Sequence, residues 1–185
     1  MVDAALEIVD SAGADALTLA RVAERVGVAP PSLYKHVDGL PGLRRLMRLR
    51  VLREFDEELR EATVGRSGDD ALRALGAAYR GYLRRHPHRS ELLEAAPDRD
   101  DPELTALADR VVEVIFATLR GYGLSGSAAV HATRCLRAAV HGFTRLEVRG
   151  GFGLPESVDE TFDHLLRMVA VGVAGLSSAS GSGVS

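Results

Sequence analysis

The sequence predicts an all-α protein of about nine helices, in which a three-helix N-terminal domain is followed by a larger helical domain. Two observations predict this class. Apolar residues recur every three or four positions along most of the chain, which is the period of an amphipathic helix, and no segment alternates as a half-buried strand does. Capping residues, prolines and glycines stand where these periodic segments begin and end. The expected boundaries are 1–46 for the first domain, 47–177 for the second and 178–185 for a disordered tail.

The N-terminal residues predict three short helices. The first carries periodic apolar residues up to Gly13 and supports the two that follow. The second begins after Thr18, whose hydroxyl suits an N-cap, and ends at Gly27, which can adopt the left-handed conformation that terminates helices. The third begins with Pro30 and Pro31, which fit only a first helical turn, and extends for barely two turns. Two short helices joined by a glycine turn form a helix-turn-helix.

The third short helix is polar on its exposed side. Only Leu33 and Val37 are apolar at helical spacing, and the other side chains include donors that phosphates and base edges accept. An ordinary polar surface helix would show the same pattern. Charge favours a DNA-facing role, because residues 16–53 hold eight Arg and Lys residues against two acids, whereas the whole chain has a net charge of −3. A basic end on an acidic body suits a protein that binds DNA through one domain.

The run T-L-x-x-V-A-x-x-x-G-V-x-x-x-S-L-Y-x-H-V, from Thr18 to Val37, resembles the DNA-binding signature of the tetracycline-repressor (TetR) family. The family usually has a basic arm before the first helix, whereas Met1 lies almost inside it here, and Leu40 stands where the family commonly has a lysine that meets the DNA backbone. The resemblance implies a set of residues that lie near base edges or phosphates, namely Thr18, Arg21, Ala29, Pro30, Pro31, Ser32, Tyr34, Lys35, His36 and Arg44.

The rest of the chain predicts a lever helix and then a helical body. The fourth helix, from near Pro41 to about Glu61, connects the domains, and its Arg44, Arg45 and Arg48 either reach phosphates or form a solvated basic face paired with acids elsewhere. Start and stop signals in the remaining chain predict five further segments: a helix from Asp69 to Pro87, a brief helical turn over 88–96 that ends at Pro97, a helix from Asp101 to Gly123, one from Ser125 or Ser127 to Val148, and one that begins with a Ser157–Glu160 capping box and carries apolar residues to Leu176.

The last two long helices have broad apolar faces and little chain left to cover them. We therefore expect a homodimer with a four-helix interface, as the resemblance also implies. The expected interface residues are Leu136, Val140, Phe143, Phe162, Leu165, Val169 and Val173. The single cysteine, Cys135, lies in the same apolar pattern, which favours a buried structural thiol over a redox sensor.

His141-Gly142-Phe143, with Leu146-Glu147, resembles the effector domain of a TetR subgroup named for a Trp-His-Gly motif, although Val140 replaces the tryptophan. The family's plan implies a small-molecule cavity inside helices five to eight, and its candidate lining residues are Tyr79, Tyr82, Phe116, Arg134 and His141. A hydrogen-bonded structural histidine is the simpler interpretation of His141.

The predicted function is a ligand-responsive transcriptional repressor that binds a pseudo-palindromic double-stranded DNA operator as a homodimer and is released by a small-molecule effector. An activator of the same fold remains open, and a helical protein-binding adaptor is disfavoured by the basic excess. We expect no cofactor, no metal and no membrane partner, and a cytoplasmic location, because no long apolar stretch or secretory pattern is present.

Other functional classes lack their required patterns. An enzyme that pairs His141 with Asp163 or Glu147 would need a nucleophile elbow, a metal cluster or paired carboxylates at a defined spacing. The Gly150–Gly153 run follows a helix rather than a strand and lacks the spacing of a phosphate loop. His86 and His88 have no cysteine or clustered carboxylates nearby that would complete a metal site.

Overall fold

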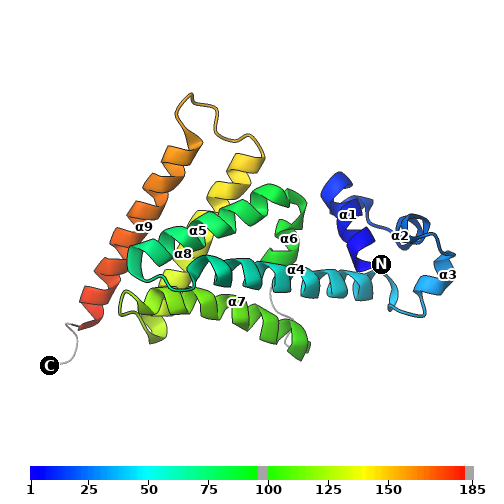
Figure 1. Cartoon of the computed structure of the whole chain (residues 1–185), viewed down its shortest axis with the longest axis horizontal. Helices are drawn as coiled ribbons and strands as arrows, with labels where there is room; N and C mark the ends of the chain where they lie inside the picture. The colour runs from blue at the N-terminus through cyan, green and yellow to red at the C-terminus, as the bar shows by residue number, and fades with distance from the viewer. Residues whose placement is uncertain (96–99, 182–185) are drawn as a thin grey trace. The chain divides into compact units, whose positions relative to one another are not determined.

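The computed structural model describes residues 1–95 and 100–181, and within these ranges the chain forms nine α-helices, two short 3-10 segments and no strand (Figure 1). The all-α prediction is therefore confirmed. Contacts divide the chain into two units: unit 1 comprises Met1–Glu54 and His86–Ala108, and unit 2 comprises Phe55–Arg85 and Asp109–Ser185. Two helices, α4 (Gly39–Thr63) and α7 (Pro102–Arg120), contribute residues to both units.

Unit 1 holds the expected N-terminal helices together with a second stretch of chain. Its other elements are α1 (Val2–Ala12), the 3-10 segment η1 (Ala14–Ala16), α2 (Leu19–Val26), α3 (Pro30–Leu33), the 3-10 segment η2 (Pro87–Arg89) and α6 (Ser90–Glu94). Each helix turns its apolar residues inward, and the unit's core includes Ala5, Leu6, Val9, Val22, Ala23, Leu33, Leu43 and Met47. The hydrophobic effect makes the burial of such a set the main stabilising contribution.

A buried cation attaches α1 to the rest of unit 1. The Arg89 guanidinium is largely buried and donates through Nε to Asp10 Oδ1 at 2.9 Å and through Nη1 to Glu54 Oε2 at 2.8 Å. Asp10 lies on α1 and Glu54 on α4, so one side chain of η2 satisfies carboxylates from two helices. This pairing compensates for the cost of burying the charge.

The expected start and stop of α2 are confirmed. The Thr18 hydroxyl accepts a hydrogen bond from the Arg21 backbone N–H at 3.2 Å, as an N-cap does. Gly27 has φ 73° and ψ 31°, the left-handed conformation that ends a helix and that other residues adopt at a cost. The α2–α3 turn is thus determined by these two residues.

α3 is shorter than the expected two turns. It spans four residues, and Tyr34, Lys35 and His36 continue as turns. The backbone N–H groups of His36 and Val37 both donate to the Leu33 carbonyl, which closes the helix and brings Val37 into the core.

Unit 2 is built around α5 (Gly68–Arg85), which contacts both α8 (Gly126–Val148) and α9 (Val158–Gly181). The latter two run side by side in opposite directions (Figure 1). The core of this unit is apolar and aromatic, and it includes Leu59, Leu72, Leu75, Tyr79, Tyr82, Leu83, Ile115, Leu119, Leu136, Val140, Phe162 and Leu166.

The expected caps of α7 and α9 are confirmed, whereas Ser125, the N-cap residue of α8, makes no side-chain cap hydrogen bond. Asp101 Oδ1 accepts from the Leu104 N–H at 3.1 Å at the start of α7, and Ser157 Oγ accepts from the Glu160 N–H at 3.3 Å at the start of α9. α9 continues to Gly181, so residues 178–181, expected in a disordered tail, belong to the helix. Residues 182–185, and Pro97 with its predicted stop, lie outside the described residues.

Two expectations about α8 and α9 need correction. Cys135 is exposed rather than buried, because the buried stripe of α8 passes through Ala132, Leu136 and Val140, and Cys135 points away from it. Four expected interface residues, Leu136, Val140, Phe162 and Val173, are at most 4% exposed within the single chain. They pack inside unit 2 and are withdrawn from the proposed interface, whereas Phe143, Leu165 and Val169 are half-buried.

Within the described residues, no helix combines the length and the apolar character needed to cross a membrane.

Candidate nucleic-acid interface

The residues predicted to face DNA lie on α2, on α3 with the turn after it, and on the first turns of α4. Nine of the ten are exposed, and Ser32 is half-buried. The exposed residues are Thr18, Arg21, Ala29, Pro30, Pro31, Tyr34, Lys35, His36 and Arg44. Tyr34 keeps 62% of its surface exposed although it is a large aromatic residue. The arrangement leaves the whole set accessible to a partner.

The turn at Gly27 sets the relation between α2 and α3. Val28 N–H donates to the Ala23 carbonyl at 3.0 Å, and Gly27 N–H donates to the Glu24 carbonyl at 3.2 Å, which is a helix-ending pattern. Leu33 inserts its side chain into the core of unit 1 and is 4% exposed. The buried Leu33 holds one side of α3 inward, so its remaining residues face outward.

Ion pairs compensate four of the eight cations in the basic segment 16–53, and a hydrogen bond to a backbone carbonyl holds a fifth. Five of its eight cations contact acceptors elsewhere in unit 1: Arg25 pairs with Glu7, Arg45 with Asp101 and Glu103, Arg50 with Glu54 and Asp3, Arg53 with Glu103, and Arg48 donates to the Ala95 carbonyl. Apart from Glu54, which lies four residues after Arg50, the acids come from sequence positions far from the arginines, so local charge counting overestimates the free positive charge.

Arg21, Lys35 and Arg44, named here the three unpaired cations, have no acidic partner in ranges 1–95 and 100–181. Arg21 Nη1 donates to the Ala16 carbonyl at 3.0 Å, which positions the guanidinium without neutralising it. All three were among the residues predicted to face DNA. Uncompensated surface cations beside an exposed polar helix suit the phosphate backbone of DNA, which dominates the affinity of such complexes.

The sequence left Arg44, Arg45 and Arg48 unresolved between phosphate contact and pairing with acids, and the structure separates them. Arg45 donates through Nη2 to Asp101 Oδ1 at 2.9 Å and also bonds through Nε to Asp101 Oδ2. These hydrogen bonds lower the pKa of Asp101. Arg44, its neighbour, is exposed and without an acidic partner among the described residues. Consecutive helical residues point about 100° apart, so neighbours meet different surroundings.

The candidate effector residues differ in their burial and in their partners. Tyr79 and Tyr82 are buried, and Tyr79 Oη lies 3.0 Å from His141 Nδ1. This hydrogen bond supports the structural interpretation of His141. Arg134 is exposed on α8, and Phe116 is half-buried on α7.

The space beside Tyr79 is small. A cavity of about 10 Å³ is lined by Leu75, Gly76, Tyr79, Ile115, Leu136, Arg137 and Val140. Such a volume admits no more than one water molecule.

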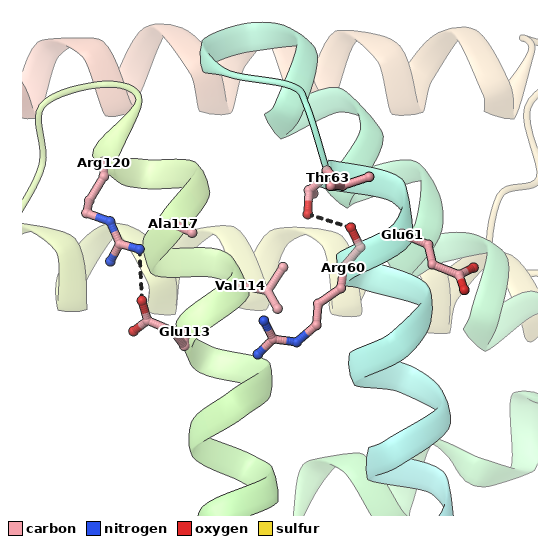
Figure 2. A pocket seen from close by; sticks show the side chains of 8 residues that line it. Arg60, Glu61, Thr63, Glu113, Val114, Ala117 and Arg120 are labelled. Atoms are coloured by element: carbon pink, nitrogen blue, oxygen red, sulfur yellow. Dashed lines mark hydrogen bonds and ion pairs between the residues drawn. The ribbon is translucent and has the colours of Figure 1, made fainter.

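A larger surface pocket, which sequence reasoning missed, lies between the last turns of α4 and the second half of α7. It measures about 600 Å³ and is lined by Arg60, Glu61, Thr63, Val64, Glu113, Val114, Ala117 and Arg120. Figure 2 shows Val114 and Ala117 on the α7 side, Arg60 on the α4 side, and Arg120 joined to Glu113. Its lining comes from two segments fifty residues apart, and no local motif marks either one.

Comparisons with known proteins agree with this geometry. Residues 1–36 match the family model "Bacterial regulatory proteins, tetR family", and residues 72–169 match "Tetracyclin repressor-like, C-terminal domain". Neither description names the Trp-His-Gly subgroup, so that resemblance stays a prediction.

Two curated relatives and one solved structure illustrate the match. An uncharacterised HTH-type transcriptional regulator of Mycobacterium tuberculosis is 37% identical, over 92% of this chain and 78% of its own length. The HTH-type regulator YobS of Bacillus subtilis is 32% identical, over 94% and 90%. A TetR variant from Acinetobacter baumannii, solved in complex with minocycline, superposes with a TM-score of 0.61 at 21% identity, over 96% of this chain and 92% of that one.

The matched relatives are transcriptional regulators, which removes the enzyme alternative, and the exposed α2–α3 surface is the helix-turn-helix that their names describe. The chain belongs to the TetR family of transcriptional regulators.

Proposed function

We propose that this protein is a homodimeric repressor that binds a pseudo-palindromic operator in the bacterial cytoplasm and releases it when a small molecule binds. The observation that carries the DNA-binding part is the set of three unpaired cations beside the exposed α3. In this proposal the start of α3 enters the major groove, while Thr18, Tyr34, His36 and the cations contact phosphates.

The homodimer rests on exposed apolar and small residues along α8 and α9. Met168 is 65% exposed and Val171 is 75% exposed, although both lie on a helix whose other face is buried. On α8, exposed Cys135, Ala138 and Gly142 follow one another at helical spacing. A side chain added at Gly142 would meet open space within the single chain. A second copy, related by a twofold axis, would cover both faces.

A twofold dimer presents two copies of α3, so its operator should contain two half-sites related by inversion. The repressor role is supported by the "repressor-like" description of the C-terminal match. An activator of the same fold would use the same interface, and the DNA-binding experiment below applies to both.

Ligand response is supported by the minocycline complex of the similar structure and by the α4–α7 pocket. The pocket's volume lies in the range of about 300–1,000 Å³ that small-molecule sites occupy. α4 runs from the unit that carries α3 into the unit that forms the pocket. A ligand that prefers one conformation of α4 would therefore change the affinity for DNA, and a ligand with equal affinity for both conformations would not.

Selection from a random pool of duplexes with the full-length protein tests this function. We expect enrichment of an inverted repeat whose half-sites are separated by about one helical turn, roughly 10 base pairs or a multiple of it. Failure to enrich any duplex, at low as well as at moderate salt, would contradict the proposal.

A further inference from the structure

The α3 apolar patch, defined as Val28, Ala29, Pro30 and Pro31, presents carbon rather than hydrogen-bonding groups at the start of the recognition helix. Val28 is 41% exposed, and the other three residues are also classed as exposed. None of the four side chains can donate or accept a hydrogen bond. The side chains at this position therefore cannot read the donor and acceptor pattern of a base pair.

The backbone at the same position also offers few hydrogen-bond donors. Pro30 and Pro31 occupy the first two helical positions and have no N–H group. The next N–H, that of Ser32, donates to the Ala29 carbonyl at 2.9 Å. The helix start is thus unsuited to binding an anion, and it exposes methyl, methylene and ring carbons.

The surroundings of the patch indicate the kind of partner that covers it. The three unpaired cations come from α2, from the turn after α3 and from α4, and acidic partners for them are missing in the described ranges. Charge complementarity therefore points to a polyanion rather than to the apolar face of another protein. The apolar feature that a DNA duplex displays in its major groove is the C5-methyl group of thymine, which 5-methylcytosine shares.

We propose that the α3 apolar patch reads C5-methyl groups of pyrimidines in the major groove, so that the preferred half-site places thymine under Val28, Pro30 and Pro31. This inference rests on the proposed function, since it concerns the same interface. It adds that base selection at these positions depends on burying a methyl group and not on hydrogen bonds, which Ser32 alone among residues 28–32 could make with its side chain.

The test uses the full-length protein and the duplex obtained by selection from a random pool. Each thymine in one half-site is replaced in turn by deoxyuridine, which removes only the methyl group, and Kd is measured by fluorescence anisotropy at fixed salt. We expect about a fourfold weakening per methyl lost at one or more adjacent positions, the value that corresponds to one buried methyl-sized group. At the same positions, a 5-methylcytosine·guanine pair should bind more tightly than an unmethylated cytosine·guanine pair by a similar factor.

Substitutions within the α3 apolar patch then test whether its side chains are the ones that contact the methyl groups. Pro31→Ser and Val28→Ser should each bind thymine and deoxyuridine duplexes with equal affinity at the position that the replaced side chain covers. Leu154→Ser is the matched control, because Leu154 is 79% exposed in the segment between α8 and α9 and lies outside unit 1, and it should keep the wild-type discrimination.

The possible outcomes distinguish a failure of methyl recognition from a failure of DNA binding. A protein that binds its selected duplex but tolerates deoxyuridine at every position would overturn methyl reading and leave DNA binding intact. Full discrimination retained by both patch variants would also overturn the assignment. A protein that enriches no duplex, yet forms a complex with another protein through residues 28–31, would overturn the proposed function together with this inference. The wild-type deoxyuridine series decides the first point even if a variant fails to fold.

Discussion

Arg80 is a buried cation in unit 2 and shows how one residue joins three helices. It lies on α5, donates to Glu147 of α8 at 2.6 and 2.7 Å, and pairs with Asp159 of α9 at 2.7 Å. Its guanidinium carbon lies 4.6 Å from the centre of the Phe162 ring, within the range of a cation–π contact. The hydrogen bonds that Arg80 donates to Glu147 raise the pKa of Arg80, so the side chain stays charged.

Replacing Arg80 with methionine should lower the free energy of unfolding by about 3 kcal/mol, because the largely buried Glu147 would lose both of its short hydrogen bonds and keep only the longer contact of 3.5 Å with Arg84. Urea denaturation followed by circular dichroism measures this change. The matched control is Arg85→Met, whose partner Glu58 is more exposed, and the expected loss there is below about 1 kcal/mol. Equal losses in the free energy of unfolding for the two variants would show that the burial of the Arg80–Glu147 pair does not increase its contribution to stability.

At the residue scale, the exposure of side chains was predicted more accurately from the sequence than their ion pairing was. The DNA-facing set followed from the signature and is exposed, apart from the half-buried Ser32. The pairing of Arg45 and Arg53 with Asp101 and Glu103 could not be read from the sequence, since the partners lie about fifty residues away. Charge density along a chain ignores contacts of this kind.

At the scale of elements, the helix starts and stops were predictable because each has a local cause. Thr18, Gly27 and Ser157 act through hydrogen bonds or backbone conformations within a few residues of themselves. The length of α3 was overestimated, because its end depends on the turn that buries Val37, which is a tertiary contact. The buried stripe of α8 was also ambiguous, because apolar and small residues lie on both of its faces.

The α2–α3 turn allows a direct test of this local reasoning. Gly27→Ala should destabilise the protein by about 1 kcal/mol, since an alanine at φ 73° is strained. Gly42→Ala is the control: Gly42 lies inside α4, and an added Cβ would make only ordinary contacts of 3.5 Å and more. That variant should be neutral or up to about 1 kcal/mol more stable. Thermal unfolding of both variants gives the comparison, and a stable Gly27→Ala protein would refute the assigned turn.

At the scale of the whole molecule, the proposed dimer explains why Met168 and Val171 are exposed on α9. Met168→Glu should convert a dimer into a monomer, because a charge buried in an apolar interface is not compensated. Leu154→Glu is the control, as Leu154 is 79% exposed but lies in the segment between α8 and α9. Light scattering during size-exclusion chromatography gives the masses. A wild-type monomer, or a Met168→Glu dimer, would rule out this interface.

The central claim is that the three unpaired cations meet the phosphates of an operator, and the salt dependence of binding tests it most directly. Kd for the selected duplex is measured across a range of salt concentrations for the wild type and for the Arg21→Ala, Lys35→Ala, Arg44→Ala triple variant, with Arg53→Ala as control. We predict that the slope of log K against log salt decreases in magnitude by about one for each phosphate contact removed, on both half-sites, and that Arg53→Ala leaves it unchanged. A triple variant that keeps the wild-type slope and affinity would contradict the account.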